Sequence, residues 1–196
     1  MTADGDEWPV RLRGVTEALV TTLGPNDLWN VAALGIHPPD DQTDPPTART
    51  WGRTRTWRNF RERGEGYVQF TRDPVLYVDA ALGVREQEGP ILDDARCWVR
   101  VRPEQHVQGT AGETQWTEWQ LVALETRVVS RTIPTFNRGY AAVVEATIAA
   151  SRLDVAAYDT SELWDRITYF EDVADRCGGP RVHQAFERIL EHIDDN

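Results

Sequence analysis

Residues 49–60 read RTWGRTRTWRNF and join two different sequence patterns. Arginine and threonine alternate at the start, as on the solvent-facing side of a β-strand. From Thr56 onward, aromatic and polar residues follow each other with a spacing that fits two turns of a helix. The stretch therefore predicts a strand that turns directly into a short helix, with Thr54 or Thr56 as N-cap and Gly64 as C-cap.

Four arginines, at positions 49, 53, 55 and 58, lie in this stretch of a chain whose formal net charge is -11. Guanidinium groups beside a helix N-terminus are suited to bind an anion, because the planar fork donates two parallel hydrogen bonds and the first-turn amides add more. Two alternatives stay open. The arginines can form the solvated face of a strand, or they can pair with some of the 32 acidic residues.

The composition describes a chain of 196 residues with a strongly acidic surface. All 21 basic residues are arginine, and lysine is absent. This combination resembles proteins of salt-in extreme halophiles, although GC-rich coding also replaces lysine by arginine. In concentrated salt the Debye length falls to roughly 3 Å, so an anion would be bound by direct contacts and not by long-range attraction.

Several functional classes lack support in the sequence. No apolar stretch approaches the roughly 20 residues that span a bilayer, and the N-terminus does not resemble a signal peptide, so we expect a cytoplasmic protein without membrane contact. Cys97 and Cys177 are expected to be free thiols, and the four scattered histidines indicate no metal site. No nucleophile or acid–base pair stands out, and the catalytic residues therefore remain unknown.

Outward from the opening stretch, short segments with strand character are separated by turns. Residues 14–23 and 29–36 predict a hairpin, followed by a proline-rich loop at 37–46. Further strands are expected at 66–72, 95–103 and 116–130, with a polar linker at 104–115, whereas 75–82 fits a helix or a strand. Together they predict an antiparallel β-barrel of about six strands.

After Pro134 the apolar residues recur with the period of a helix. Asp159 and Glu162 form a capping box for a second helix, and Gly178-Gly179-Pro180 separates it from a last helix that ends near His192. The fold class is therefore mainly β plus α. We expect a barrel domain over residues 10–132 and a C-terminal helical subdomain over 133–196.

The order of these motifs resembles a known family. NVAALGI after a hairpin turn, and GRTRTWRNF after the next strand, resemble the FMN-binding split barrels related to flavin reductases and pyridoxamine phosphate oxidases. Two further segments, RDPVLYVDAALG and NRGYAAVVEATIAASRLDV, are similar to a narrower, largely archaeal family known as domain of unknown function 447. The resemblance covers most of residues 12–155.

The resemblance implies FMN as cofactor and names two groups of binding residues. One group supplies small side chains and a flat backbone edge for the flavin ring, and the other supplies donors for the phosphate. The expected cofactor-binding residues are Asn30, Val31, Ala32 and Ala33 in the first group and Arg53, Thr54, Arg55, Thr56 and Asn59 in the second.

The same resemblance implies a homodimer with flavin sites at its interface, and an oxidoreductase that takes hydride or electrons from NADH or NADPH. A non-catalytic flavin carrier or sensor on the same barrel is an alternative, because flavin chemistry need not leave a catalytic side chain in the sequence. A nucleic-acid-binding module is a further alternative, since arginines interleaved with aromatic residues also suit phosphates and bases. The acidic net charge opposes that alternative.

Overall fold

The computed structural model describes residues 7–39, 41, 44–133 and 135–195. Three features of the sequence fall partly outside this range: the six residues at the N-terminus, part of the loop at 37–46, and Pro134 at the change to helical sequence. The remaining expectations all concern described residues.

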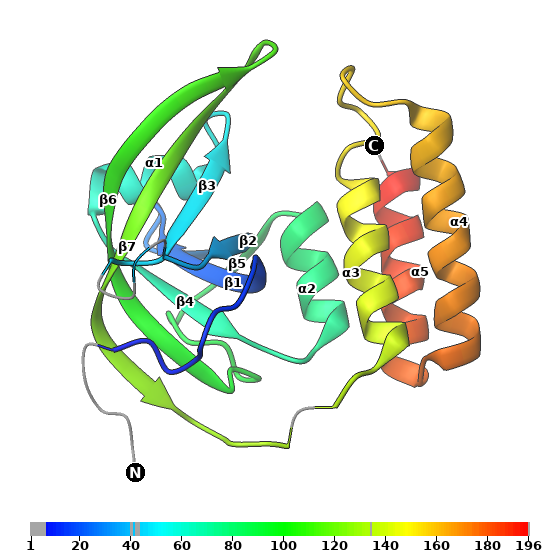
Figure 1. Cartoon of the computed structure of the whole chain (residues 1–196), viewed down its shortest axis with the longest axis horizontal. Coiled ribbons are helices and arrows are strands. Elements are labelled where there is room, and N and C mark those ends of the chain that lie inside the picture. Colours follow the sequence, from blue (N-terminus) through cyan, green and yellow to red (C-terminus); the bar gives the residue numbers. More distant parts are fainter. Residues whose placement is uncertain (1–6, 40, 42–43, 134, 196) are drawn as a thin grey trace. The chain divides into compact units, whose positions relative to one another are not determined.

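The chain forms two compact units, which are described separately (Figure 1). The barrel unit contains the described residues up to Arg72 together with Arg85–Arg131. The helical unit contains Asp73–Val84 and the described residues from Thr132 onward.

Seven antiparallel strands form the barrel unit. They are β1 (Thr16–Leu23), β2 (Trp29–His37), β3 (Thr47–Trp51), β4 (Gly66–Phe70), β5 (Arg85–Gln87), β6 (Cys97–Ala111) and β7 (Thr114–Val128). Six of them close a ring in the order β1-β4-β6-β7-β3-β2, because β2 also pairs with β1, and the short β5 pairs with β2. The predicted antiparallel barrel of about six strands is therefore confirmed.

The barrel encloses a packed apolar core. Val20, Val68 and Val99 lie opposite one another on the neighbouring strands β1, β4 and β6, and all three are fully buried. The ring of Phe60, from helix α1 (Arg55–Arg63), packs edge-to-face on that of Trp119 with 5.5 Å between centroids. Because side chains fill the interior, a ligand of the barrel must bind at its surface.

Strand β2 pairs with three strands. Within the described chain it is the only strand of the ring that has two different partners along the same edge. Along its whole length it pairs with β1. On its other edge, residues 29–31 pair with β5 and residues 36–37 pair with β3. The backbone edge of residues 32–35 therefore has no strand partner among the described residues, and this gap is where the barrel is split.

Helix α1 begins and ends at the residues that its caps dictate. The Thr54 hydroxyl oxygen accepts a hydrogen bond from the Trp57 N–H at 3.2 Å, which makes Thr54 and not Thr56 the N-cap. Gly64 ends the helix with φ of 66°, a left-handed conformation that glycine adopts without steric cost. The predicted strand-to-helix junction is present, with β3 ending at Trp51.

The predicted linker at 104–115 is wrong, because most of it belongs to strands β6 and β7. These strands continue as a long ribbon that turns at Gly112 (φ 58°) (Figure 1). Side chains on both faces of the outer ribbon are largely exposed, so no apolar alternation marks it as strand. Backbone hydrogen bonds between β6 and β7 hold the ribbon together, and amino-acid composition does not predict such bonds.

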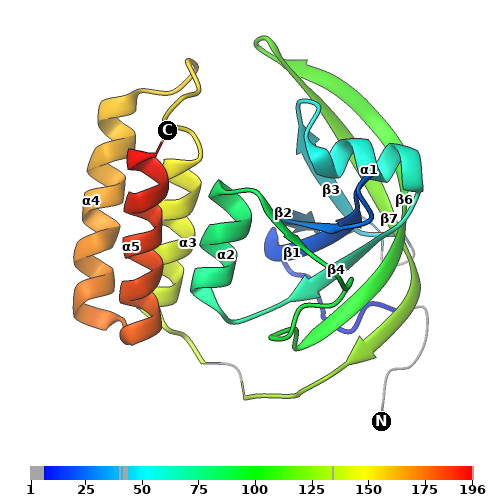
Figure 2. The ribbon, with the colours of Figure 1, turned by 180° about the vertical axis from the view of Figure 1, so that it is seen from behind.

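The helical unit contains four helices around a core of small and branched side chains (Figure 2). They are α2 (Pro74–Leu82), α3 (Arg138–Ala150), α4 (Thr160–Cys177) and α5 (Pro180–Asp194). Asp159 caps α4 by accepting hydrogen bonds from the N–H groups of Ser161 and Glu162. Arg188 of α5 donates to the Asp79 carboxylate of α2 at 3.1 Å.

Helix α2 lies in the sequence between barrel strands β4 and β5, yet it belongs to the helical unit. Its residues Val75 and Val78 are buried in the same core as α3, α4 and α5. The expected barrel range of 10–132 is therefore interrupted by this helix. The sequence could not predict that α2 packs on the C-terminal helices. Apolar residues surround most of α2, and a helix without a polar face has no periodicity that shows which side is buried.

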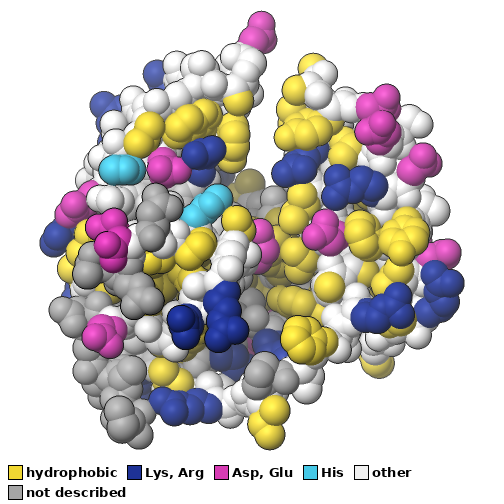
Figure 3. All heavy atoms as spheres, in the orientation of Figure 1, with side chains coloured by type: hydrophobic (Ala, Val, Ile, Leu, Met, Phe, Trp, Pro, Cys, Tyr) yellow, Lys and Arg dark blue, Asp and Glu magenta, His cyan; other side chains and the backbone are white. Residues whose placement is uncertain are grey.

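Arginine and acidic side chains are interspersed on the visible face of both units (Figure 3). Many are close enough to pair, as for Arg100 with Glu65 and Glu125. Among the described residues, no helix has the length and apolar character that a membrane-crossing segment requires.

A buried amide holds the segment after β5 against the barrel. Gln69 of β4 is fully buried; its Nε2 donates to Thr21 Oγ1 (3.0 Å) and to the Pro90 carbonyl (2.8 Å), and its Oε1 accepts from the Leu92 N–H (2.8 Å). Both hydrogens of Nε2 and the oxygen Oε1 therefore take part in hydrogen bonds. Together with the Thr21 hydroxyl, which also donates to the Pro90 carbonyl, Gln69 anchors the segment that follows β5.

We expect Gln69→Leu to lower the free energy of unfolding by about 1–3 kcal/mol, because the buried Leu92 N–H loses its acceptor. Gln108→Leu on the exposed outer ribbon is the matched control and should change stability by less than about 0.5 kcal/mol. Urea unfolding followed by circular dichroism measures both. Equal stabilities of the two variants would contradict the role assigned to Gln69.

Candidate functional site

A pocket of about 290 Å³ opens beside the first turn of α1. Four elements of the barrel unit contribute to it: the β1–β2 turn, strand β2, helix α1 and strand β5. Its lining residues are Gly24, Pro25, Asn26, Asn30, Arg55, Arg58, Asn59 and Glu86. The pocket therefore brings the predicted Asn30, Arg55 and Asn59 together, although 29 residues of sequence separate the first from the last.

Helical spacing explains which side chains of α1 reach the pocket. Arg55, Arg58 and Asn59 are three and four residues apart and share one face of the helix. Asn59 is buried, and its Nδ2 donates to the Oγ1 of Thr22 at 3.0 Å, which holds this face against β1. Arg58 is exposed and has no ion-pair partner among the described residues. It was not among the residues predicted for the site.

The start of α1 adds backbone donors to these cations. Thr54 satisfies the N–H of Trp57 through its hydroxyl and that of Arg58 through its carbonyl. The N–H groups of Arg55 and Thr56 have no hydrogen-bond partner within the described chain. First-turn amides of this kind carry the positive end of the helix dipole, so the region favours an anion.

Glu86 brings a negative charge into the same pocket. Its Oε1 accepts from the Arg55 guanidinium at 2.8 Å, and its Oε2 accepts from Asn26 Nδ2 at 3.2 Å. Sequence reasoning missed this residue because β5 is only three residues long and carries no apolar pattern. The pairing of β5 with β2, which places Glu86 opposite Asn30, is a long-range contact.

The other predicted residues of the arginine stretch lie around the pocket and not in its lining. Arg53 and Thr54 are exposed in the turn that leads into α1, and the Arg53 guanidinium lies 5.9 Å from the Trp57 ring centroid. Thr56 is buried on the inner side of the helix. Arg49 pairs with Glu118 at 2.9 Å, so for this arginine the internal ion-pair alternative applies.

The predicted residues of β2 lie at the open edge of the barrel. Ala32 and Ala33 are half-buried and belong to the 32–35 segment whose outer edge lacks a strand partner in the described structure. The side chain of Val31 is buried, so this residue offers only its backbone. Since Asn30 lines the cationic pocket, the pocket and the open edge follow each other along one strand.

This arrangement suits an elongated ligand with an anionic end and a flat group. The anion would face the arginines and amides at α1, and the flat group could lie on small side chains beside backbone N–H and C=O groups. No cluster of three or more metal-ligating side chains occurs in the described residues. Burial raises the pKa of the Cys97 thiol to about 11, so this thiol is protonated at neutral pH.

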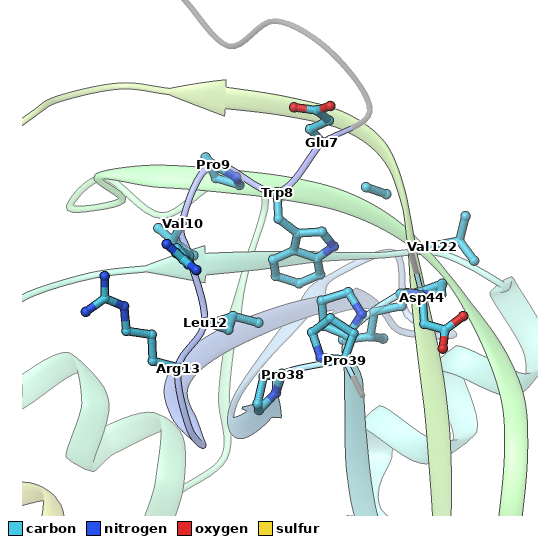
Figure 4. Close-up of a pocket in the computed structure, with 15 residues that line it drawn as sticks. Glu7, Trp8, Pro9, Val10, Leu12, Arg13, Pro38, Pro39, Asp44 and Val122 are labelled. Atoms are coloured by element: carbon cyan, nitrogen blue, oxygen red, sulfur yellow. The ribbon is translucent and has the colours of Figure 1, made fainter. Parts of the chain in front are cut away.

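A larger hollow of about 1210 Å³ lies elsewhere on the barrel unit (Figure 4). The Trp8 indole points into it toward Pro38 and Pro39. Prolines and aliphatic side chains form much of its lining, and none of the predicted site residues contributes to it. We take the smaller pocket as the candidate site because cations, free amides and the open strand edge meet there.

Comparison with solved structures of other proteins finds one that shares this fold over nearly the whole chain and others with weaker similarity. An FMN-bound protein from Methanosarcina mazei is 24% identical, with a TM-score of 0.79, and the match covers 92% of this chain and 96% of that one. A flavin reductase in complex with NADP+ is 16% identical over 61% of this chain and 81% of its own, with a TM-score of 0.41. A flavoredoxin from Methanosarcina acetivorans is 10% identical over 66% of this chain and 79% of its own, with a TM-score of 0.44.

Family models match both parts of the chain. The N-terminal domain of the protein family of unknown function DUF447 matches residues 16–130, which include every strand of the barrel. The C-terminal domain of the same family matches residues 137–191, which include α3, α4 and most of α5. The order of the two matches agrees with the resemblance found in the sequence. The chain therefore belongs to the DUF447 family.

Proposed function

We propose that this protein binds FMN and uses it as an oxidoreductase. The observation that carries the proposal is the continuity of the cationic pocket at α1 with the open edge of β2. FMN has a dianionic phosphate at one end and a planar ring with a polar edge at the other, so it matches both parts of the site. The FMN bound by the Methanosarcina mazei relative supports the same assignment.

The phosphate would lie at the start of α1. Arg55 and Arg58 line the pocket, and the N–H groups of Arg55 and Thr56 in the first turn have no hydrogen-bond partner within the described chain. Arg53 and the hydroxyl group of Thr54, both exposed in the turn before α1, are the remaining donors that we assign to the phosphate. The Thr56 hydroxyl, which we also expected there, is buried, so we assign only the backbone N–H of Thr56 to the phosphate. Each charge-assisted hydrogen bond to a phosphate contributes about 1.5–3 kcal/mol, so a few of them suffice for specific binding.

The flavin ring would lie along residues 32–35 of β2. Ala32 and Ala33 let a flat ring approach the backbone, and the unpaired backbone groups can bond to its polar edge. Asn30 stands between the two parts of the site. No hydrogen bond engages its side-chain amide within the described residues, so the amide is available to the ligand.

The chemistry of the reaction would come from the flavin, which accepts a hydride and passes on electrons. The chain's own task would be to hold the phosphate, orient the ring and leave one ring face open for NADH or NADPH. The pocket lining contains no histidine, cysteine or serine that could act as a nucleophile. The same site without access for a nicotinamide would serve a flavin carrier or sensor.

We predict that the protein becomes yellow on addition of FMN and binds FMN more tightly than riboflavin. Arg55→Ala and Arg58→Ala should each weaken FMN roughly ten- to a hundredfold, through the loss of one phosphate contact, and should leave riboflavin almost unchanged. Flavin fluorescence titration measures both affinities. The control is Arg61→Ala on the same helix but outside the pocket, which should keep the FMN affinity of the unmodified protein. FMN and riboflavin affinities that are equal in all four proteins would refute a phosphate site at α1.

We predict that NADH or NADPH bleaches the bound FMN in an anaerobic stopped-flow experiment, faster than it bleaches the same concentration of free FMN. The physical reason is that a bound ring is held in a fixed orientation toward the nicotinamide. If the bleaching is no faster than that of free FMN, the protein is a carrier or sensor and not a nicotinamide-dependent reductase.

We also propose that each flavin site is completed by a second copy of the chain. A pocket of about 290 Å³ and a single strand edge cover only part of a ligand of this size. Sedimentation at high salt should therefore show a dimer of the 22.3 kDa chain. A strict monomer that still binds FMN tightly would exclude shared sites.

A further inference from the structure

Glu86 is an acidic residue in a pocket that otherwise favours anions. Both oxygens of its carboxylate are engaged, one by the Arg55 guanidinium at 2.8 Å and the other by Asn26 Nδ2 at 3.2 Å. The ion pair therefore occupies one of the two arginines that line the pocket. A phosphate that enters the pocket meets this carboxylate as well as the cations.

The two partners of this ion pair differ in how many contacts hold them and in how far they are exposed. Glu86 is held by its pairing opposite Asn30, by the bond from Asn26, and by the anchoring of the segment after β5 through Gln69. Its side chain is 24% exposed, whereas that of Arg55 is 50% exposed. Arg55 is thus the more exposed and less anchored member, so its guanidinium has room to turn toward a ligand while the carboxylate stays in the lining.

We propose that Glu86 is a specificity-determining residue that competes with the ligand's phosphate for Arg55 and thereby limits the affinity of the site for phosphate-bearing flavin. The proposal rests on the proposed function, because it assumes that the ligand's phosphate lies at the start of α1. The site would therefore bind FMN with lower affinity than its arginines alone would give. A lower affinity suits a flavin that is released and replaced.

The sign of the effect follows from charge. A carboxylate about 5 Å from a phosphate repels it whatever the detailed geometry, and between an effective dielectric constant of about 80 and one of about 20 this repulsion is worth roughly fourfold to more than a hundredfold in affinity. Glutamine in place of Glu86 removes the charge but keeps an oxygen that can accept from Arg55. Glu86→Gln therefore separates competition from positioning: a residue that merely oriented Arg55 would weaken FMN when it loses its charge.

The test compares FMN and riboflavin affinities of the full-length protein and of Glu86→Gln by fluorescence titration. It uses the lowest salt concentration at which circular dichroism shows both proteins folded, because salt screens the repulsion. We expect Glu86→Gln to bind FMN roughly three- to thirtyfold more tightly and riboflavin with unchanged affinity. Glu88→Gln, an exposed neighbour outside the pocket, removes the same charge from the chain and should change neither affinity.

Two results would overturn the proposal while leaving the proposed function intact. One is an FMN affinity of Glu86→Gln that equals or falls below that of the unmodified protein, with riboflavin binding preserved. The other is an equal gain in Glu88→Gln, which would reflect net charge and not the contact with Arg55. By contrast, failure of the unmodified protein and of both variants to prefer FMN over riboflavin would refute the phosphate site itself.

Discussion

The division of strand β2 among three partners is the constraint on which the site depends. Backbone N–H and C=O groups are strong hydrogen-bonding groups, and leaving them buried without partners is costly. Because β5 and β3 each cover only one end of the same edge of β2, the four-residue stretch between them keeps backbone groups, those of every second residue, that only solvent or a ligand can satisfy in the described structure. A ring of strands that closed fully would have no such edge. On the function that we propose, the ligand would bind at an incompletely paired strand and not in the interior, which packed side chains fill.

The second determinant of the site is the junction between β3 and α1. Thr54 fixes the first turn of the helix, and Asn59 ties that turn to β1, so the direction of the arginines is set by two short polar side chains. Glu86 balances the charge that results, because three arginines within six residues would otherwise repel one another beside a helix dipole of the same sign. Arg55 therefore has two roles in the proposed site, as half of an ion pair with Glu86 and as a cation in the pocket that we assign to the phosphate.

Local signals decided which parts of this structure could be predicted from the sequence. Caps such as Gly64 and Asp159, the turn between β1 and β2, and the alternation in the inner half of β7 each act over a few residues, and the sequence predicted them correctly. For the N-cap of α1 it left Thr54 and Thr56 open, and the structure selects Thr54. The outer ribbon of β6 and β7 was not predicted as strand because it is polar on both faces. Helix α2 could not be distinguished from a strand because it is apolar on almost every side. Part of the pocket could not be predicted either: Asn26 and Glu86 reach it only through strand pairings, which no local pattern encodes. Whether Asn30, Arg53 and the other predicted residues hold a flavin remains a prediction for the titrations.

The insertion of α2 between two barrel strands has a consequence for biosynthesis. During translation the barrel strands emerge from the ribosome before the helices that share a core with α2, since β7 ends at Val128 and α3 begins at Arg138. Val75 and Val78 must therefore remain without their native neighbours until the end of the chain has been made, about 60 to 110 residues later at rates of roughly 5–20 residues per second. For the same reason, neither half of the gene encodes a self-sufficient helical unit. A fragment that begins at Thr132 lacks one wall of its own core, and a fragment that stops there carries that wall with nothing to cover it.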